Sequence, residues 1–264
     1  MSPGAPPEVE CTRLSKGFDG GVEVLREIDL RIAAGRTTAF VGPSGCGKST
    51  LLRLIAGLER PSSGAVEIGG RPPAETLRRA GLAVAFQDPS LLPWRTVRGN
   101  VELALKLARR RPRPRAVEDL IALVGLSGFE DARPAALSGG MRQRAAIARA
   151  MVTEPGLLLL DEPFGAVDEL TRRQLAEDLP RLWEARETTA ILVTHSIHEA
   201  VMLSDRVVVF SSRPARIVAD VRIDLPRPRP AGTTADPAFL ALSDRVSAAL
   251  ARGMADRTDG LAAQ

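Results

Sequence analysis

The N-terminal part of the chain alternates short apolar runs of β character with Gly-rich turns. A different pattern, with apolar residues at helical spacing, occupies Lys48–Leu58. The short runs predict strands at Val9–Leu14, Val24–Ile32, Thr37–Val41 and Ala65–Ile68. Together these patterns predict an antiparallel β flap beside a strand that leads into a helix.

The middle of the chain shows helical spacing, with apolar residues at Val97, Val101 and Leu105 and an interruption by the Arg- and Pro-rich run 109–115. We interpret about 88–152 as an inserted helical subdomain. Beyond it, β/α alternation returns, with strands predicted at Leu157–Leu160, Ala190–Thr194 and Val207–Phe210. The predicted fold class is α/β, with a mostly parallel sheet, an N-terminal antiparallel β flap and the inserted helices.

The C-terminal part begins with a Pro-rich segment, 225–230, which predicts a linker after a main domain at 1–225. Asp236 and Pro237 are suited to the start of a helix. One face of that helix carries Phe239, Leu242, Val246 and Leu250. Residues 226–264 are thus predicted as a linker and an amphipathic helix, which either packs on the main body or serves a regulatory or partner-binding role.

Composition narrows the possibilities. The 264 residues are 44% hydrophobic and 26% charged, as in an ordinary globular protein. The net charge is +4, and nearly all of the cations are Arg. This charge balance is weak evidence for nucleic-acid binding, so no nucleic-acid partner is expected. Cys11 and Cys46 are too few for a disulfide framework and are expected to be free thiols. Because the chain shows neither a spanning apolar run nor a signal peptide, we expect an intracellular protein that meets membranes only through a partner.

The clearest chemical signal follows the strand Thr37–Val41 and opens the helical pattern. It fits G-x-x-x-x-G-K-[ST] followed by Thr, and comprises Gly42, Pro43, Ser44, Gly45, Cys46, Gly47, Lys48, Ser49 and Thr50. Backbone N–H groups of such a loop surround phosphate oxygens, Lys48 reaches the β- and γ-phosphates, and Ser49 holds Mg²⁺. This segment predicts a P-loop that binds a nucleoside triphosphate, against the alternative of a Gly-rich turn with an incidental Lys.

A pair of carboxylates follows the apolar strand Leu157–Leu160. Asp161 is predicted to contact Mg²⁺ through a water molecule, and Glu162 to act as the general base on the attacking water. Acidic pairs after buried strands also occur as helix starts, which is the structural alternative.

A second Gly-containing turn, Ser138-Gly139-Gly140-Met141, opens another helical pattern and suggests a second anion-binding helix end. With this turn in place, the sequence resembles the ATPases of ABC transporters over nearly the whole chain up to about residue 225. The resemblance implies that these four residues form the signature motif, which caps an ATP held by another copy of the chain. Met141 stands where many members carry Gln.

The same resemblance implies roles for further residues. Phe18 is similar to the aromatic residue that stacks on adenine, where Tyr is commoner, and a packed hydrophobic residue is the alternative. Gln87 resembles the residue that meets Mg²⁺ and the attacking water and signals to the membrane partner. Asp168 ends the segment Phe164–Asp168, which resembles the loop that crosses the dimer interface. His195 resembles the switch histidine at the γ-phosphate, which with Glu162 and Gln87 completes the implied catalytic set.

The segment from Phe86 to Val97, together with the signature and the Pro-rich tail, is similar to ATPases of nitrate, sulfonate, taurine and bicarbonate importers. This implies an ATPase dimer at the cytoplasmic face of a membrane, bound to permease subunits and served indirectly by an extracytoplasmic binding protein. A soluble ABC ATPase without a transport role is the alternative. The apolar residues of Ser90–Trp94 suggest a permease-docking groove, with core packing as the other interpretation.

Overall fold

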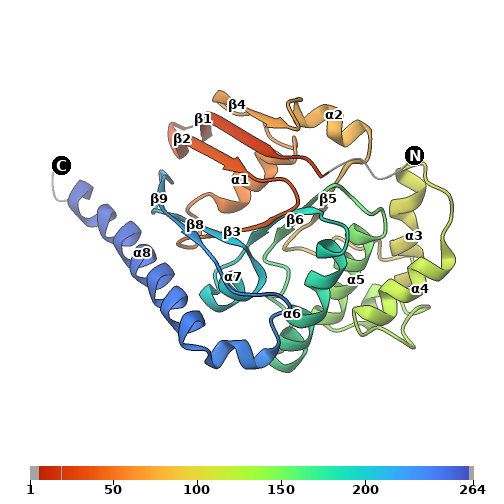
Figure 1. Ribbon diagram of the computed structural model, residues 1–264. Helices are drawn as coiled ribbons and strands as arrows, with labels where there is room; N and C mark the ends of the chain where they lie inside the picture. Colours follow the sequence, from red (N-terminus) through yellow and green to blue (C-terminus); the bar gives the residue numbers. More distant parts are fainter. Residues whose placement is uncertain (1–5, 19, 262–264) are drawn as a thin grey trace.

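The computed structural model describes residues 6–18 and 20–261. Two sheets form its β structure, and Figure 1 shows the smaller one above the larger one. The smaller sheet is antiparallel in the order β2-β1-β4, with β1 Val9–Phe18, β2 Val22–Ile32 and β4 Ser63–Ile68. The larger sheet has the order β5-β6-β7-β3-β8-β9, with β3 Thr37–Val41, β5 Leu82–Ala85, β6 Leu157–Asp161, β7 Thr189–Val193, β8 Arg206–Phe210 and β9 Ile217–Arg222. Its pairs are parallel except β8–β9.

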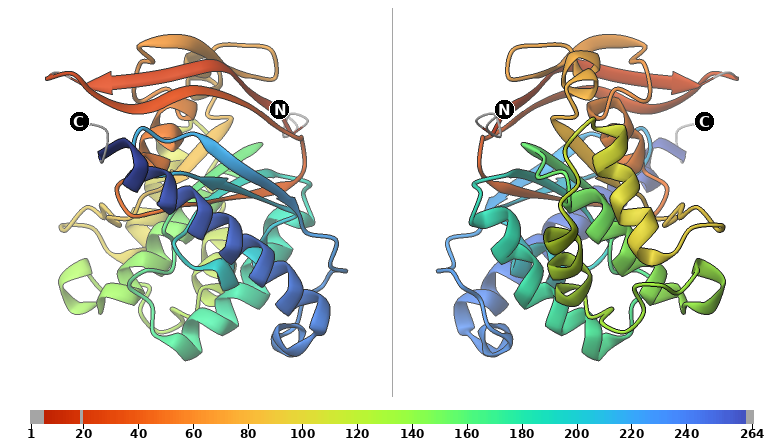
Figure 2. Two further views of the ribbon diagram at one scale, coloured as in Figure 1. Left: turned by 90° about the vertical axis from the view of Figure 1, so that its left-hand side faces the viewer. Right: turned by 90° about the vertical axis from the view of Figure 1, so that its right-hand side faces the viewer.

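The helices separate into two layers around the larger sheet (Figure 2). Helix α1 lies between the two sheets, and the longer helices cover the other face. The helices are α1 Lys48–Ile55, α2 Pro73–Arg78, α3 Val97–Leu107, α4 Pro114–Leu123, α5 Gly139–Met151, α6 Glu169–Glu184, α7 Ile197–Leu203 and α8 Pro237–Leu261, with short 3₁₀ turns at Pro134–Ala136 and Ala231–Ala235. Helices α3 to α5 form the helical subdomain.

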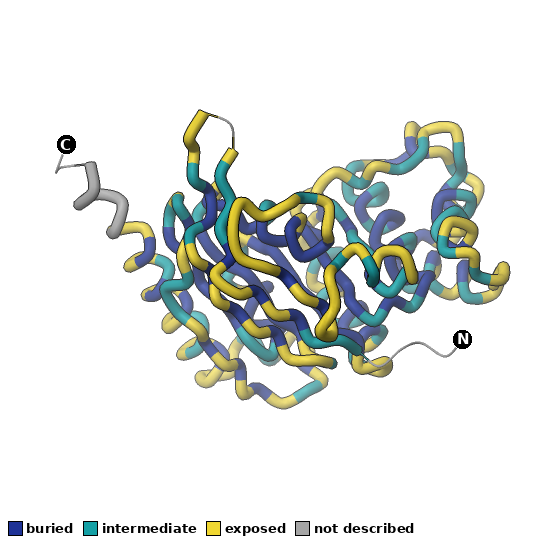
Figure 3. The backbone as a smooth tube through the Cα atoms, turned by 90° about the horizontal axis from the view of Figure 1, so that it is seen from above, coloured by how far each residue is buried: buried dark blue, intermediate teal, exposed yellow. Residues whose placement is uncertain are grey.

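Alternation along the buried strands builds two hydrophobic cores. In β3, Phe40 points to the core shared with α1 and the flap, whereas Ala39 and Val41 belong to the core under the long helices. Successive side chains of a strand point to opposite faces, so one strand serves both cores. Buried positions accordingly run along the central strands in Figure 3. The larger sheet is a rigid platform whose strand ends can carry a site.

The predicted fold class is confirmed. Two elements were not predicted: α2, which has no buried residue, and the half-buried antiparallel edge strand β9. Both lack a strong apolar periodicity, because neither is enclosed by the core. Pro180, which interrupts the apolar pattern of its segment, is buried inside the single helix α6.

The Pro-rich segment is fastened to the main body. The Arg229 guanidinium, 6% exposed, donates to the carbonyls of Val201, Met202 and Ser204 at 2.9, 3.1 and 2.7 Å. These bonds satisfy the carboxyl end of α7, and burial lowers the pKa of Arg229 to about 10. Helix α8 follows and packs on α7 and β9, with Phe239 in the main core. The C-terminal segment is therefore part of the same folded body.

Candidate functional site: the nucleotide pocket at the strand ends

The loop of residues 42–47 connects the end of β3 to the start of α1. Gly47 has a φ of 126°, and a Cβ there would lie 2.8 Å from Val24 Cγ1, so a glycine is required. Lys48 is 6% exposed, and its ammonium donates to the carbonyls of Gly42 and Pro43 at 2.7 and 2.9 Å. The lysine ammonium is thereby held against the loop. Phosphate oxygens could replace the two carbonyls as its hydrogen-bond acceptors.

The hydroxyl of Ser49 donates to Asp161 Oδ1 at 2.8 Å, which joins the start of α1 to the end of β6. Burial raises the pKa of Asp161, and the Ser49 hydrogen bond partly counteracts that rise. A hydroxyl beside a carboxylate is an oxygen donor set of the kind that Mg²⁺ prefers when phosphate oxygens supply further ligands. These two residues therefore fit a magnesium ion bound together with a nucleotide.

Three polar side chains meet beside the P-loop. Gln87 Nε2 donates to Glu162 Oε2 at 3.3 Å, and His195 Nδ1 lies 3.4 Å from the same oxygen. They follow β5, β6 and β7, neighbouring parallel strands whose carboxyl ends share one edge of the sheet. Glu162 has a φ of 47°, an uncommon value for a side chain other than glycine, while its N–H donates to Val193 O at 2.9 Å. Glu162 thus combines an uncommon backbone conformation with a side chain that borders the same cavity as the P-loop.

A cavity of about 510 Å³ contains these groups. Its lining consists of Ser44, Gly45, Gly47, Lys48, Ser49, Thr50, Gln87, Glu162, His195 and Arg213. Arg213 was missed in the sequence, because nothing in its local pattern separates it from other surface arginines. Among the predicted P-loop residues, Gly42 and Pro43 contribute carbonyls to Lys48, and the Cys46 side chain is buried in the core beneath the flap.

Phe18 does not line this cavity. It lies at the end of β1, is 45% exposed, and has the Lys16 ammonium 4.8 Å from its ring centroid. A cation over an aromatic face is a modest local contact, so the ring is open on the flap surface.

The signature residues lie elsewhere on the chain. Ser138 caps α5 by accepting from the Met141 N–H at 3.3 Å, and Asp168 caps α6 by accepting from the Thr171 N–H at 3.0 Å. The hydrogen bonds from Thr171 lower the pKa of Asp168. A Cβ on Gly140 would lie 3.0 Å from Ala166 O, so the two caps are packed together. None of the signature residues lines the P-loop cavity.

Buried polar residues connect these parts. Asn100, fully buried, bonds to the backbone of Leu92, Arg95 and Thr96, and Gln143 Nε2 on α5 donates to Phe86 O at 3.1 Å. The segment before and after Gln87 is thus fixed to α3 and α5. Neither Asn100 nor Gln143 was predicted from the sequence, since a polar residue in a helical pattern gives no sign of whether it is buried.

The loop of His195 has its own support. Thr194 Oγ1 donates to the carboxylate of Glu199 at 2.6 Å, and Arg172 Nε lies 3.7 Å from that carboxylate. Burial raises the pKa of Glu199. Because Arg172 also donates to Val167 O at 3.0 Å, this carboxylate links the loop before Asp168 to the loop of His195.

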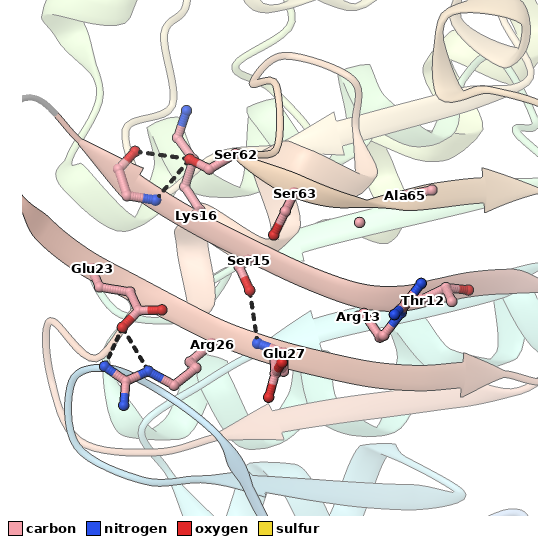
Figure 4. Close-up of a pocket in the computed structure, with 12 residues that line it drawn as sticks. Thr12, Arg13, Ser15, Lys16, Glu23, Arg26, Glu27, Ser62, Ser63 and Ala65 are labelled. Atoms are coloured by element: carbon pink, nitrogen blue, oxygen red, sulfur yellow. Dashed lines mark hydrogen bonds and ion pairs between the residues drawn. The ribbon is translucent and has the colours of Figure 1, made fainter.

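A separate hollow of about 880 Å³ lies on the flap, where its labelled side chains come from β1, β2, β4 and the turn before β4 (Figure 4). Among its charged groups, Arg26 Nε donates to Glu23 Oε2 at 2.6 Å, and Lys16 pairs with Glu59 outside the hollow. None of the P-loop, Gln87, Glu162 or His195 borders it. Although it is larger than the P-loop cavity, it carries no comparable chemistry.

Across residues 6–18 and 20–261, no helix has the length and apolarity needed to cross a membrane.

The chain is similar to known proteins at the level of family, sequence and structure. The family model for ABC transporters matches residues 25–165. The aliphatic sulfonates import ATP-binding protein SsuB of Rhodopseudomonas palustris (strain BisA53) is 50% identical over 222 residues, covering 83% of this chain and 76% of that protein.

The bicarbonate transport ATP-binding protein CmpC of Synechococcus elongatus is 48% identical over 228 residues, which span 84% of this chain but 34% of that longer protein. Among solved structures, the dimeric post-hydrolysis state of the ATP-binding cassette MJ0796 bound to ADP and Pi superimposes with a TM-score of 0.74 at 27% identity, covering 82% of this chain and 99% of that one.

Proposed function

The chain belongs to the ABC transporter family, as an ATP-binding subunit that hydrolyses ATP, and we propose that it drives an importer of small anions such as sulfonates or bicarbonate. The observation that carries the catalytic part is the convergence of Gln87, Glu162 and His195 beside the P-loop. The importer part rests on relatives named for sulfonate import and bicarbonate transport.

In this proposal the loop N–H groups and the start of α1 receive the phosphates of ATP. Lys48 exchanges its bonds to Gly42 O and Pro43 O for the β- and γ-phosphate oxygens. Ser49 would hold Mg²⁺ directly and Asp161 through water, and the ion would neutralise charge between the β- and γ-phosphates. The 2.8 Å bond between these two residues supports the assignment.

Glu162 is the proposed general base. It accepts the proton of a water whose oxygen bonds to the γ-phosphorus, while the bond from that phosphorus to the bridging oxygen breaks, giving ADP and phosphate. The Gln87 amide donates to the carboxylate and orients it. His195, whose side chain is 60% exposed, is free to turn from Glu162 towards the γ-phosphate. Phe18 is proposed as the adenine platform at the end of the flap.

The signature residues are proposed to act on a second copy. Ser138, Gly139 and Gly140 leave the start of α5 open, and Ser138 is exposed. A homodimer would place this positive helix end on the γ-phosphate held by the other copy, with Asp168 near the junction. The dimeric state of the MJ0796 relative supports this arrangement.

Coupling to a permease is proposed to pass through residues 88–96. Trp94 is 68% exposed, whereas Leu91 packs against the core and Leu92 is held through its backbone by Asn100. The docking proposal therefore narrows to Trp94 and its immediate surroundings, at the cytoplasmic face of the membrane. A binding protein outside the membrane would choose the solute, because the P-loop site contacts only ATP.

The test is co-expression of a tagged chain with a candidate permease. The complex is then purified in detergent, and uptake of labelled sulfonate and bicarbonate is measured in proteoliposomes supplied with a candidate binding protein. We expect a complex whose uptake requires ATP. A purified chain that hydrolyses ATP but retains no membrane protein would contradict the transport assignment, and would favour a soluble ABC ATPase.

A further inference from the structure

The hairpin loop between β8 and β9, residues 211–216, reaches the P-loop. Arg213 Nε donates to Gly45 O at 3.0 Å, and its Nη2 donates to the same carbonyl. The guanidinium borders the P-loop cavity alongside Ser44 and Lys48. A second cation therefore stands at the phosphate cavity, contributed by a part of the chain that none of the motifs includes.

The backbone on both sides of Arg213 is held from two directions. Ala215, fully buried, donates to Val24 O at 2.8 Å and accepts from the Arg26 N–H at 3.2 Å, which ties the loop to the flap. The Ser212 N–H donates to Gly253 O at 3.1 Å, which ties it to α8. The loop is thus hydrogen-bonded to both the flap and the C-terminal helix. These bonds hold the backbone on either side of Arg213, whose side chain borders the cavity.

Among residues 6–18 and 20–261, no carboxylate forms an ion pair with Arg213 and its Nη1 makes no hydrogen bond. Its Nε and Nη2 both donate to Gly45 O. A guanidinium is planar, permanently charged and weakly hydrated, which suits it to phosphate oxygens.

We propose that Arg213 is a further nucleotide-binding residue, which contacts the phosphate chain of ATP or ADP at the mouth of the P-loop while fixing the Gly45 carbonyl away from it. This proposal rests on the proposed function. It assigns a binding role to the β8–β9 hairpin, and through Ser212 it connects the C-terminal helix to the nucleotide.

The experiment compares the purified chain with Arg213→Gln and Arg213→Lys by calorimetric titration of adenosine, ADP and ATP at low and high salt. Arg213→Gln should weaken ADP and ATP binding by roughly tenfold at low salt, less at high salt, and leave adenosine unchanged, because only the phosphates meet the charge. Arg213→Lys should recover part of the loss, since it keeps the charge but not the fork. Arg216→Gln, which removes an exposed cation from the same loop, is the matched control and should bind ADP as the unmodified chain does.

Equal ADP affinity in Arg213→Gln and the unmodified chain would overturn the proposal. An equal loss for adenosine and ADP, or the same loss in Arg216→Gln, would also overturn it by pointing to loop structure or to general charge. Lys48→Ala, titrated in parallel, separates this proposal from the function on which it rests. If Lys48→Ala weakens ADP binding and Arg213→Gln does not, only the arginine assignment fails, whereas an unmodified chain that binds no ADP refutes the nucleotide site itself.

Discussion

Two helix starts in this molecule are suited to anions, and they differ in what surrounds them. The start of α1 faces Asp161 through Ser49, and Gln87, Glu162 and His195 line the same cavity. The start of α5, capped by Ser138, has the backbone of Ala166 and Val167 as its close neighbours. The same kind of helix start therefore borders a cavity lined by polar side chains in one place and lies at the surface in the other.

The difference arises from topology. Helix α1 follows β3, whose neighbours β7 and β8 end at the same edge of the sheet, so loops from several strands converge there. Helix α5 begins in the helical subdomain, and although its Gln143 bonds to Phe86 O just after β5, none of its first residues lines the P-loop cavity. We propose that the start of α5 requires groups from another molecule, and the following experiments test this difference between the two helix starts.

The largest effect is expected from Glu162→Gln. The amide keeps the shape of the side chain but cannot accept a proton, so ATP hydrolysis should fall by roughly 10² to 10⁴ while ATP still binds. Phosphate release measures the rate, and gel filtration with ATP and Mg²⁺ should show an accumulated dimer. Glu102→Gln, an exposed carboxylate on α3, is the control. A mutant that stays monomeric and hydrolyses at the normal rate would refute both the general base and the proposed ATP-bound dimer.

Lys48→Ala tests whether the cavity at the start of α1 binds ATP. Loss of the charge-assisted bonds should remove about 2 to 4 kcal/mol of interaction with the phosphates, which weakens ATP binding or stops turnover. Titration with ATP and a phosphate-release assay measure the two outcomes. Lys106→Ala, an exposed lysine of α3, should change neither. Unchanged hydrolysis in Lys48→Ala would remove the P-loop assignment.

Ser138→Asp tests the exposed start of α5. Asp preserves the helix cap, but its charge repels a γ-phosphate brought by another copy, so hydrolysis should fall by roughly tenfold to hundredfold. ATP binding by the isolated monomer, measured by titration in the absence of Mg²⁺, should stay unchanged because the P-loop is intact. If the mutation weakens monomer binding instead, the two helix starts share one site within a chain and the comparison fails.

Trp94→Ser addresses a surface outside both helix ends. Loss of an exposed aromatic anchor should weaken assembly with the permease by roughly 30-fold while basal ATP hydrolysis stays normal. Co-purification from detergent extracts and proteoliposome uptake measure the effect. Leu107→Ser, which removes another exposed apolar side chain of the helical subdomain, is the control. Normal uptake by Trp94→Ser would remove this residue from the docking surface.

The smallest effect concerns stability. Burial raises the pKa of Asp161, so the folded chain retains this proton where the unfolded chain has released it. The contribution of the carboxyl to stability is full below its ordinary pKa and is lost as the pH rises through the raised one, which leaves a destabilising carboxylate at neutral pH. Without nucleotide and metal, Asp161→Asn should therefore raise the Tm by about 2 to 4 °C at pH 7.

Asp168 gives the opposite sign. Its pKa is lowered by the cap bonds from Thr171, so the carboxylate stabilises the fold at neutral pH and loses that effect as the pH falls through the lowered pKa. Asp168→Ala should lower the Tm at pH 7, as calorimetry can measure. A lower Tm in Asp161→Asn would contradict the assignment of Asp161 as a carboxyl held for function at the expense of stability.

Local patterns were enough to predict much of the architecture. Apolar alternation and the Gly-Lys-Ser turn located β3 and α1, and the run ending in Asp161 located β6, because each pattern reports on residues close together in the chain. The flap was predicted in the same way, although β1 and β2 extend beyond the predicted limits. The edge strand β9 and helix α2 were missed, since weak burial leaves little periodicity in the sequence.

Which residues could perform phosphate chemistry, and where most of the buried strands and helices lie, could be predicted from the sequence, because glycine turns, caps and apolar periods act over a few residues. The folded chain was needed to show that Gln87, Glu162 and His195 share one cavity, that Asn100 is buried, and that Arg213 lies beside Gly45. These contacts join segments far apart in the chain. Their existence depends on strand order and loop path, which no local pattern encodes.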